Sequence, residues 1–215
     1  MTSRTEEEEL AQIKDWWQRN GKPLLTGSVL ALVAVFGWQT WQKHQTNQAQ
    51  AASALYQQLV EVSLKPSGQP DAGKVSELAG KLNKDFAGSH YAQYASLLLA
   101  KVAVDGGRLD DAAAELRKVL DKPVDATLGE VARQRLARVL AAKDKTEDAL
   151  ALLAGEAAPA FVAGREELRG DLLAKLGRTA EARSAYEKAR AAMPQDAGLG
   201  TLQIKLDDLA DGEAS

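Results

Sequence analysis

The segment AGREELRGDLLAKLGRTAEARSAYEKARAAMP, from Ala163 to Pro194, decides the fold of this chain. Its small, aromatic and proline residues are spaced by seven, five, four, three and five positions: Gly170, Gly177, Ala182, Tyr186, Ala189 and Pro194. A small residue where two helices cross lets their backbones approach, and a large neighbour fills the groove that remains. Proline prevents a helix from continuing. The spacing therefore predicts two packed helices that end before Pro194.

These are the spacings of a tetratricopeptide repeat, with Leu173 where an aromatic residue is usual. Two weaker copies precede it, the first with its proline one position early and the second with aspartate at the turn: Ala100, Gly107, Ala112, Leu116 and Pro123, then Ala137, Asp144, Ala149 and Leu153. Ala112, Ala149 and Ala182 recur at intervals of 37 and 33 residues, which bracket the period of about 34 residues. Three copies in series predict a stack of helical pairs.

Further helices are predicted on both sides of these copies. A degenerate fourth pair precedes them, with these inward residues: Leu55, Leu59 and Val62 on its first helix, and Val75, Leu78 and Leu82 on a second helix over 71–86. Lys65–Pro70 is a turn by its proline and glycine content, and Ser89 caps the next helix. Beyond Pro194, a last amphipathic helix covers the open end of the stack with Leu199, Leu202, Leu206 and Leu209.

The composition agrees with an all-α protein. The 215 residues are 45% hydrophobic, 27% charged and 5% aromatic, and alanine and leucine dominate, which favours helices over sheets. The absence of cysteine excludes disulfides, thiol catalysis and thiolate metal sites. A net charge of −3 gives no reason to expect a nucleic-acid partner.

One stretch near the N-terminus predicts a transmembrane helix. From Pro23 to Gln42 the chain has no ionisable side chain, and its twenty residues would span roughly 30 Å as a helix, the thickness of a bilayer core. The tryptophans flank this stretch, as in an aromatic belt: Trp16, Trp17, Trp38 and Trp41. A cleaved signal peptide would need a small-x-small site soon afterwards, and Ala49-Gln50-Ala51 lies too far downstream.

Basic residues set the predicted orientation. Lys14, Arg19 and Lys22 precede the apolar stretch, whereas Lys43 alone follows it closely, so the N-terminus is expected in the cytoplasm. In a bacterium the C-terminal part then faces the periplasm. The predicted layout in the bacterial inner membrane is a cytoplasmic tail over 1–22, a transmembrane helix over 23–42 and a periplasmic tetratricopeptide-like repeat domain over 43–215.

The tail has its own helical pattern. Thr5 and Glu8 fit a capping box, Leu10, Ile13 and Trp17 share a face, and Gly21 is placed to end the helix: this is the prediction for residues 1–22. The helix would lie on the inner leaflet or against a membrane partner. The alternative, equally open, is a solvated tail that only orients the protein.

No residue pattern predicts catalysis, a cofactor or a metal site. His44 lies beside the apolar stretch, and His90 is expected to be a polar residue at a helix N-terminus. The motifs of phosphate-binding loops, dinucleotide sites, zinc proteases and serine hydrolases are missing from the sequence. Arg133, Arg135 and Arg138 cluster on one helix, and nearby acids such as Glu130 favour a charged helix surface over an anion site. We therefore predict a non-enzymatic protein.

Stacked repeats bind partners on a concave face lined by the first helix of each pair. The repeat frame places these candidate partner-binding residues there: Tyr94, Leu97, Lys101, Gln134, Arg138, Glu167 and Asp171. Repeat modules that clamp a C-terminal carboxylate use Lys and Asn at set positions, which here hold Leu97, Gln134 and Glu167. That mode is therefore not expected. The mixed charge and apolar surface suit a protein or an unfolded segment.

The whole layout resembles the YfgM family of bacterial inner-membrane proteins. The similarity lies in these stretches: Asn20-Gly21-Lys22, Ser96–Lys101, Arg135–Val139 and Gly177–Tyr186. The resemblance implies an ancillary subunit of the SecYEG translocon that works near emerging envelope proteins, together with a membrane-anchored periplasmic chaperone of the PpiD type. It also implies a link to a cytoplasmic stress regulator. None of these stretches is a catalytic motif.

The predicted layout and the family resemblance lead to two hypotheses about function. The first is a membrane-anchored adaptor or chaperone-like subunit at the translocon, which binds translocon components and periplasmic folding factors or emerging chains. The alternative is a scaffold or oligomerisation module of an envelope or cell-division complex, with the same repeats and no client binding. Crosslinked partners distinguish the two.

Overall fold

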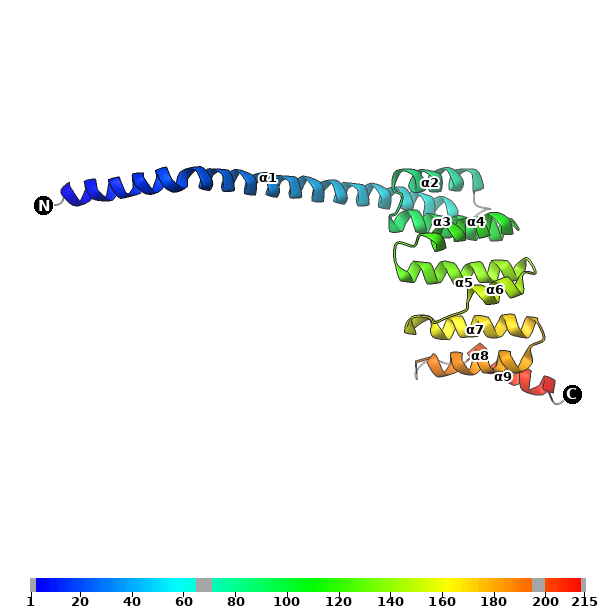
Figure 1. The fold of residues 1–215 in the computed structure, drawn as a ribbon. Coiled ribbons are helices and arrows are strands. Elements are labelled where there is room, and N and C mark those ends of the chain that lie inside the picture. Colours follow the sequence, from blue (N-terminus) through cyan, green and yellow to red (C-terminus); the bar gives the residue numbers. More distant parts are fainter. Residues whose placement is uncertain (1–2, 65–70, 195–199, 214–215) are drawn as a thin grey trace. The chain divides into compact units, whose positions relative to one another are not determined.

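The computed structural model describes residues 3–64, 71–194 and 200–213, and the regular elements within these ranges are α-helices (Figure 1). In chain order they are α1 (Ser3–Ser63), α2 (Ala72–Asp85), α3 (His90–Asp105), α4 (Leu109–Asp121), α5 (Ala126–Ala142), α6 (Thr146–Leu152), α7 (Pro159–Lys175), α8 (Thr179–Ala192) and α9 (Gly200–Glu213). The prediction of an all-α fold is confirmed. The chain forms two compact units, Met1–Ala51 and Ala52–Ser215.

The first unit consists of the N-terminal part of α1, which continues through Gly21. The prediction that Gly21 ends a helix is therefore wrong. Glycine inside a helix costs only about 1 kcal/mol, and the Trp17 ring lies against Gly21, 3.2 Å from where a Cβ would stand. The helix instead bends at Pro23, which has no N–H to donate to the preceding turn.

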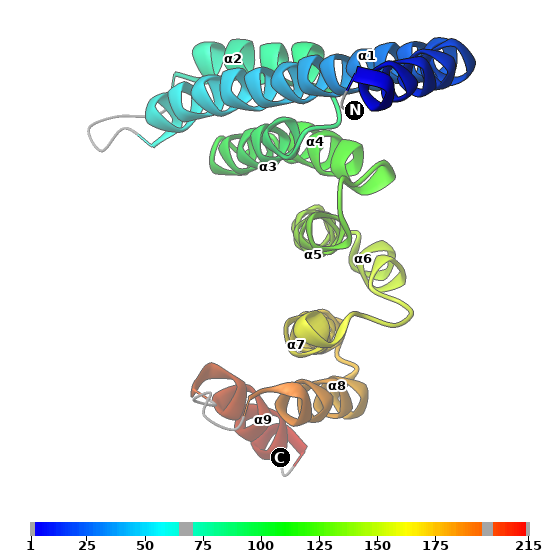
Figure 2. The same ribbon diagram turned by 90° about the vertical axis from the view of Figure 1, so that its left-hand side faces the viewer.

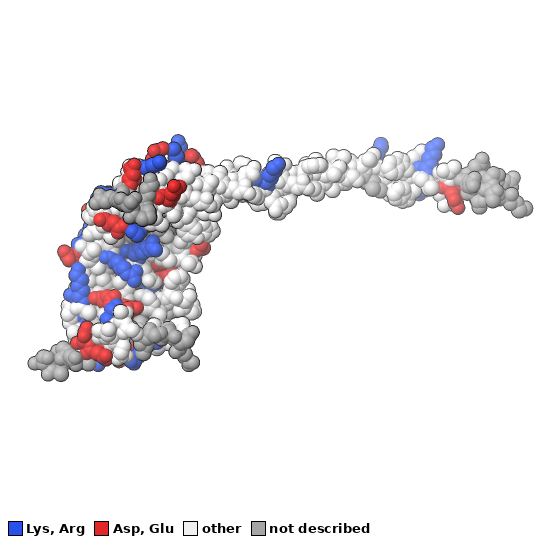
Figure 3. All heavy atoms as spheres, turned by 180° about the vertical axis from the view of Figure 1, so that it is seen from behind, with Lys and Arg blue, Asp and Glu red and all other residues white. Residues whose placement is uncertain are grey.

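The apolar stretch of α1 is exposed along its length. Leu30 is 69% exposed and Phe36 and Trp38 are each 63% exposed. On the face seen in Figure 3, the helix of the first unit has a long stretch without charged side chains. Within the described residues, no single helix has the length and apolarity of a membrane span, but the bent pair Glu9–Pro23 and Leu25–Ser63, at 42°, does by length and composition. The predicted capping box lies outside the described side chains.

The second unit is a stack of helical pairs. Figure 2 shows α3, α5 and α7 in one layer and α4, α6 and α8 in the other. The pair before α3 is formed by the end of α1 with α2, where Ala52 and Leu59 share a hydrophobic cluster with Val75 and Leu82. The predicted helix over 71–86 is thus confirmed as α2, and the predicted turn Lys65–Pro70 lies outside the described residues.

The turns inside the pairs α3–α4, α5–α6 and α7–α8 have the left-handed backbone that the repeat pattern requires. Gly107 and Gly177 both have φ 72°, and Asp144, which replaces glycine in the second copy, has φ 58°. Aspartate tolerates this conformation better than most residues because its short polar side chain can bond locally. The predicted cap is also present, since the Ala92 N–H donates to Ser89 Oγ over 3.1 Å.

Close packing at the helix crossings holds each pair together. Ala112, Ala149 and Ala182 are completely buried where α4, α6 and α8 pack on their partners. Between α7 and α8 the approach is closest, because a Cβ at Gly170 would overlap the Tyr186 ring, with Cζ only 2.9 Å away. The predicted roles of the small and large positions are therefore confirmed.

Helix α9 covers the last pair, as predicted. Leu202 and Leu206 are buried in a cluster with Leu173, Tyr186 and Ala189, and Leu209 packs against it. Leu199 lies outside the described residues. The C-terminal helix thus covers apolar surface of α7 and α8 that a further repeat would otherwise cover.

We predict that Gly170→Ala lowers the free energy of unfolding by about 1–3 kcal/mol, because the added methyl group overpacks the Tyr186 ring. The matched control is Gly80→Ala on α2, where a Cβ meets no atom within 4 Å. That change should raise the free energy by up to about 1 kcal/mol through helix propensity. Urea unfolding of both variants measures the difference, and an equal effect at the two glycines would contradict the packing account.

Candidate partner-binding groove

The predicted partner-binding residues lie on one layer of the stack. Tyr94, Leu97 and Lys101 are on α3, Gln134 and Arg138 are on α5, and Glu167 and Asp171 are on α7. The structure brings only part of this set together. Leu97, Lys101 and Arg138 line one cavity, whereas the others are engaged elsewhere.

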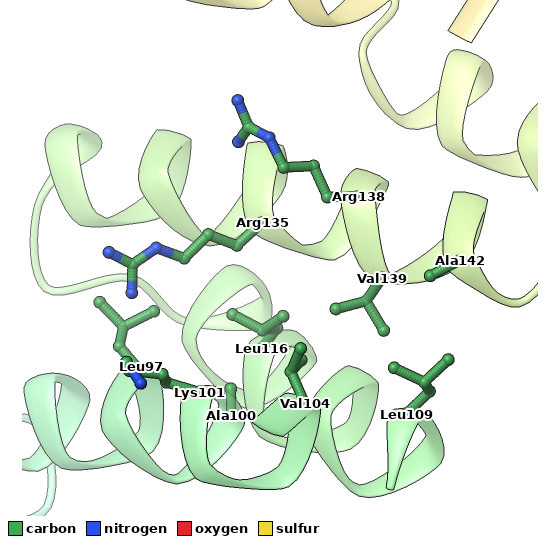
Figure 4. A pocket seen from close by; sticks show the side chains of 10 residues that line it. All are labelled: Leu97, Ala100, Lys101, Val104, Leu109, Leu116, Arg135, Arg138, Val139 and Ala142. Carbon is green, nitrogen blue, oxygen red and sulfur yellow. The ribbon is translucent and has the colours of Figure 1, made fainter. Parts of the chain in front are cut away.

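A cavity of about 340 Å³ opens between α3, α4 and α5 (Figure 4). We call it the α3–α5 groove, and it is lined by Leu97, Ala100, Lys101, Val104, Leu109, Leu116, Arg135, Arg138, Val139 and Ala142. Its floor is apolar. Leu97, Leu116 and Val139 are buried there, and Val104 remains 41% exposed at the edge.

Three cationic residues lie at the edge of this apolar floor: Lys101, Arg135 and Arg138. The Arg138 guanidinium group points away from the floor (Figure 4). Arg135 and Arg138 are exposed on α5 and form no ion pair or hydrogen bond within the described part of the chain. Lys101, on α3, pairs with Asp105 on the same helix over 2.5 Å. In Figure 4 the Arg135 side chain extends over the α3 side of the groove toward Leu97. The groove therefore combines apolar surface with two guanidinium groups that have no carboxylate partner.

Tyr94 lies in an aromatic cluster beside the groove. Its ring is 5.8 Å from that of Tyr56 and 6.3 Å from those of Tyr91 and His90. Tyr94 is 36% exposed, so it adds apolar surface to this end of the layer. Burial is the main cause that raises the pKa of its neighbour Tyr56, with the Tyr94 hydroxyl adding to it.

His90 is at the N-terminus of α3, as predicted. Its Nε2 lies 3.0 Å from Oδ2 of Asp125, the N-cap residue of α5. The Leu128 N–H donates to Oδ1 of the same carboxylate over 2.8 Å, and this bond is the largest cause that lowers the pKa of Asp125. The pair links the starts of two helices and leaves the histidine in a structural role.

Gln134 belongs to a polar network between α5 and α7. Its Nε2 donates to Glu130 Oε1 over 3.0 Å, and Arg165 Nε donates to the same oxygen over 2.9 Å. A second bond joins Arg165 Nη2 to Glu130 Oε2. Burial works against the ionised form of Glu130, but the bonds from Arg165 and Gln134 outweigh it and lower the pKa. Gln134 therefore belongs to a hydrogen-bond network that joins α5 to α7.

Glu167 and Asp171 face helix α9. Lys205 Nζ lies 2.8 Å from Glu167 Oε1 and 2.7 Å from Asp171 Oδ1. Tyr186 Oη donates to the same Asp171 oxygen over 2.9 Å. Burial opposes the charge of Lys205, but the bonds to the two carboxylates raise its pKa. The two acidic residues predicted to bind a partner, Glu167 and Asp171, are thus bound by Lys205 of the chain's own C-terminal helix.

Several residues of the groove are not among the residues predicted from the repeat frame. The spacing of Leu97, Lys101 and Val104, four and then three apart, could have placed Val104 on the same helix face. Arg135, Val139 and Ala142 repeat this spacing on α5. Arg135 was expected on a charged helix surface, and the structure places it at the groove instead.

Comparison with known proteins identifies the family. The profile of the tetratricopeptide repeat-like domain matches residues 14–211. A protein of Escherichia coli named ancillary SecYEG translocon subunit is 34% identical over 208 residues, which cover 95% of this chain and 97% of the relative. The chain belongs to the family of ancillary SecYEG translocon subunits.

Other relatives with the same name support this membership. One from Neisseria gonorrhoeae is 32% identical and covers 95% of this chain and 97% of its own length. One from Haemophilus influenzae is 30% identical and covers 86% of this chain and 88% of its own. No solved structure matches the chain.

The buried pair Glu130–Arg165 gives a stability prediction for this family fold. Glu130→Ala should lower the free energy of unfolding by about 3 kcal/mol, because it leaves the Arg165 guanidinium buried at 4% exposure without its carboxylate. The double variant Glu130→Leu/Arg165→Met should recover most of this loss, since no charge remains buried. Urea unfolding of the wild type and both variants tests this, and a double variant as unstable as Glu130→Ala would contradict it.

The same pair predicts a pH dependence. The pKa of Glu130 is lower in the folded chain than its value of about 4.3 in unfolded peptides. Its stabilisation is therefore complete above the unfolded pKa and is lost as the pH falls through the folded pKa. Compared with the double variant, the wild type should lose more stability on acidification below about pH 4.3.

Lys205 gives a prediction for the C-terminal helix. Lys205→Ala removes the cation between Glu167 and Asp171 and leaves two like charges one helical turn apart, so α9 should detach more readily. Hydrogen exchange of residues 200–213 should become faster, while that of α5 stays unchanged. Lys188→Ala on α8 is the control, because Lys188 is exposed and has no ion pair among the described residues. Equal exchange in both variants would show that the ion pairs do not hold α9.

Proposed function

We propose that this protein is a membrane-anchored, non-enzymatic adaptor that associates with the SecYEG translocon. The observation that supports this most strongly is similarity along almost the whole chain to relatives named ancillary SecYEG translocon subunits. The described second unit has a groove that could accept a protein segment, and many of its charged residues form ion pairs within or between helices. Both features agree with a binding role.

The proposed anchor is the apolar stretch over 23–42. Its side chains are exposed around the helix, and such a large exposed apolar surface is typical of a segment that enters a membrane. Trp38 and Trp41 lie at one end of it, as in an interfacial aromatic belt, with ring centroids 5.2 Å apart. The basic residues before the stretch favour a cytoplasmic N-terminus and a repeat domain in the periplasm.

The anchor would make weak binding effective. A groove held close to a translocon meets each emerging chain at a high effective concentration, so a low intrinsic affinity still gives useful occupancy. We propose that the second unit binds periplasmic folding factors or emerging envelope proteins in this way. A membrane-anchored chaperone of the PpiD type and a cytoplasmic stress regulator are the partners implied by the family resemblance.

Photocrosslinking in living cells tests this function. Photoreactive residues at Val33 in the apolar stretch and at Tyr94 beside the groove should give adducts with translocon subunits, folding factors or emerging chains. A probe at exposed Lys188 on α8 is the matched control and should give few adducts. Adducts only with division or envelope-assembly proteins would overturn the adaptor in favour of the scaffold.

A further inference from the structure

We propose that the α3–α5 groove binds an acidic, apolar protein segment, one that inserts an apolar side chain into the cavity and places carboxylates on Arg135 and Arg138. This inference rests on the proposed function, because it names the class of partner that the adaptor would bind. Three observations support it: the apolar floor, the two unpaired guanidinium groups and the engagement of the carboxylates elsewhere on the layer.

The floor favours an apolar side chain over a polar ligand. Leu97, Leu116 and Val139 form its buried base, and Val104 stays exposed at the edge. Burying apolar surface of this kind is worth about 25 cal/mol per Å² removed from water. The volume of about 340 Å³ lies at the small end of the range of ligand pockets, roughly 300–1,000 Å³, which suits a large side chain.

The charges favour carboxylates on the same segment. Arg135 and Arg138 are one helical turn apart on α5, and both are exposed. Arg135 extends over the groove toward Leu97, whereas the Arg138 guanidinium group points from the edge of the groove away from its floor (Figure 4). Neither forms an ion pair within the described residues, whereas Lys101 on the facing helix is paired with Asp105. A guanidinium group binds a carboxylate through two parallel hydrogen bonds, so this pair of arginines is matched to acidic side chains on a bound segment.

The carboxylates described on this layer are paired with other cations. Asp105 is bound by Lys101 at the groove, and Glu166 is bound by Arg169 on α7. Glu130 is bound by Arg165, and Glu167 and Asp171 are bound by Lys205. Among the described groups of this layer, the positive charge without an internal partner is thus concentrated at Arg135 and Arg138. A basic segment would meet repulsion there, and a purely apolar one would leave the two arginines unused.

An anionic lipid is the other ligand class with apolar and acidic parts. The cavity lies between helices and has room for a side chain rather than for a pair of acyl chains, which favours a protein segment. A peptide-binding experiment distinguishes a protein segment from an anionic lipid. It uses the full chain in nanodiscs of neutral phosphatidylcholine, so that lipid charge cannot supply the signal.

Fluorescence anisotropy with three short labelled peptides measures the preference. The first has leucines flanked by Asp and Glu, the second replaces the acids with lysines, and the third replaces the leucines with serines. We expect the first peptide to bind about tenfold more tightly than either of the others, since it alone uses both the guanidinium groups and the floor. Added salt should weaken its binding.

Arg135→Glu/Arg138→Glu should weaken binding of the acidic peptide by about tenfold or more and improve binding of the lysine peptide. The matched control is Lys188→Glu/Arg190→Glu, which changes the net charge equally at exposed positions of α8 outside the groove. Val104→Ser should weaken binding of both leucine peptides, because it removes apolar surface from the groove and leaves the two arginines unchanged. Thermal unfolding of each variant checks that the stack remains folded.

Equal affinity for the acidic and lysine peptides would overturn the inference, as would unchanged binding by the groove variant. Vesicles of phosphatidylglycerol test the lipid alternative. If they abolish peptide binding by the wild type, and if Arg135→Glu/Arg138→Glu no longer binds the vesicles, the groove is assigned to lipid instead. These results are separate from the crosslinking test of the proposed function. If crosslinking gives adducts with translocon subunits but the acidic and lysine peptides bind equally well, only the inference about the groove is rejected. If the acidic peptide is preferred but crosslinking gives adducts only with division or envelope-assembly proteins, only the proposed function is rejected.

Discussion

The structure depends on close approach of paired helices at positions that hold only small side chains. Gly170 has no room for a Cβ beneath the Tyr186 ring, and Ala112, Ala149 and Ala182 are completely buried at the equivalent crossings of the stack. Because the backbones come this close, each inner pair of helices can bury one face against the pair before it and the other against the pair after it. The stack then has an open end after α8, which explains why the chain adds α9 rather than ending at Pro194.

This stacking also explains where charged and apolar residues gather on the surface. The layer of α3, α5 and α7 is formed by successive first helices, so residues far apart in sequence become neighbours across it. Several of its charges are neutralised between helices, by Arg165 on Glu130 and by Lys205 on two carboxylates of α7, and others are paired within one helix. The exception is the edge of the α3–α5 groove, where an apolar floor meets Arg135 and Arg138. A surface with this combination suits the recognition of a protein segment that we propose.

The repeat frame could be predicted from sequence because its requirements are steric and local. A small residue at a crossing, a left-handed turn and a proline after the pair each exclude most alternatives, and even Asp144 could be recognised as a turn residue. The tail was harder, because Gly21 weakens a helix by only about 1 kcal/mol and the neighbouring Trp17 ring covers it. The groove was predicted in part. Helix spacing places residues on a face, but it does not say that Lys205 on a later helix binds two of them.

Hydrogen exchange of the full chain in nanodiscs, with and without purified SecYEG translocon carrying an emerging chain, tests the central claim that this groove is the working surface. The account predicts that amides of α3 and α5 around the groove exchange more slowly in the complex, while those of α8 do not change. Slower exchange confined to α8 and α9, or to residues 23–42 alone, would contradict it. The first of those results would place the partner on the opposite layer, and the second would leave the repeat domain without a role in the complex.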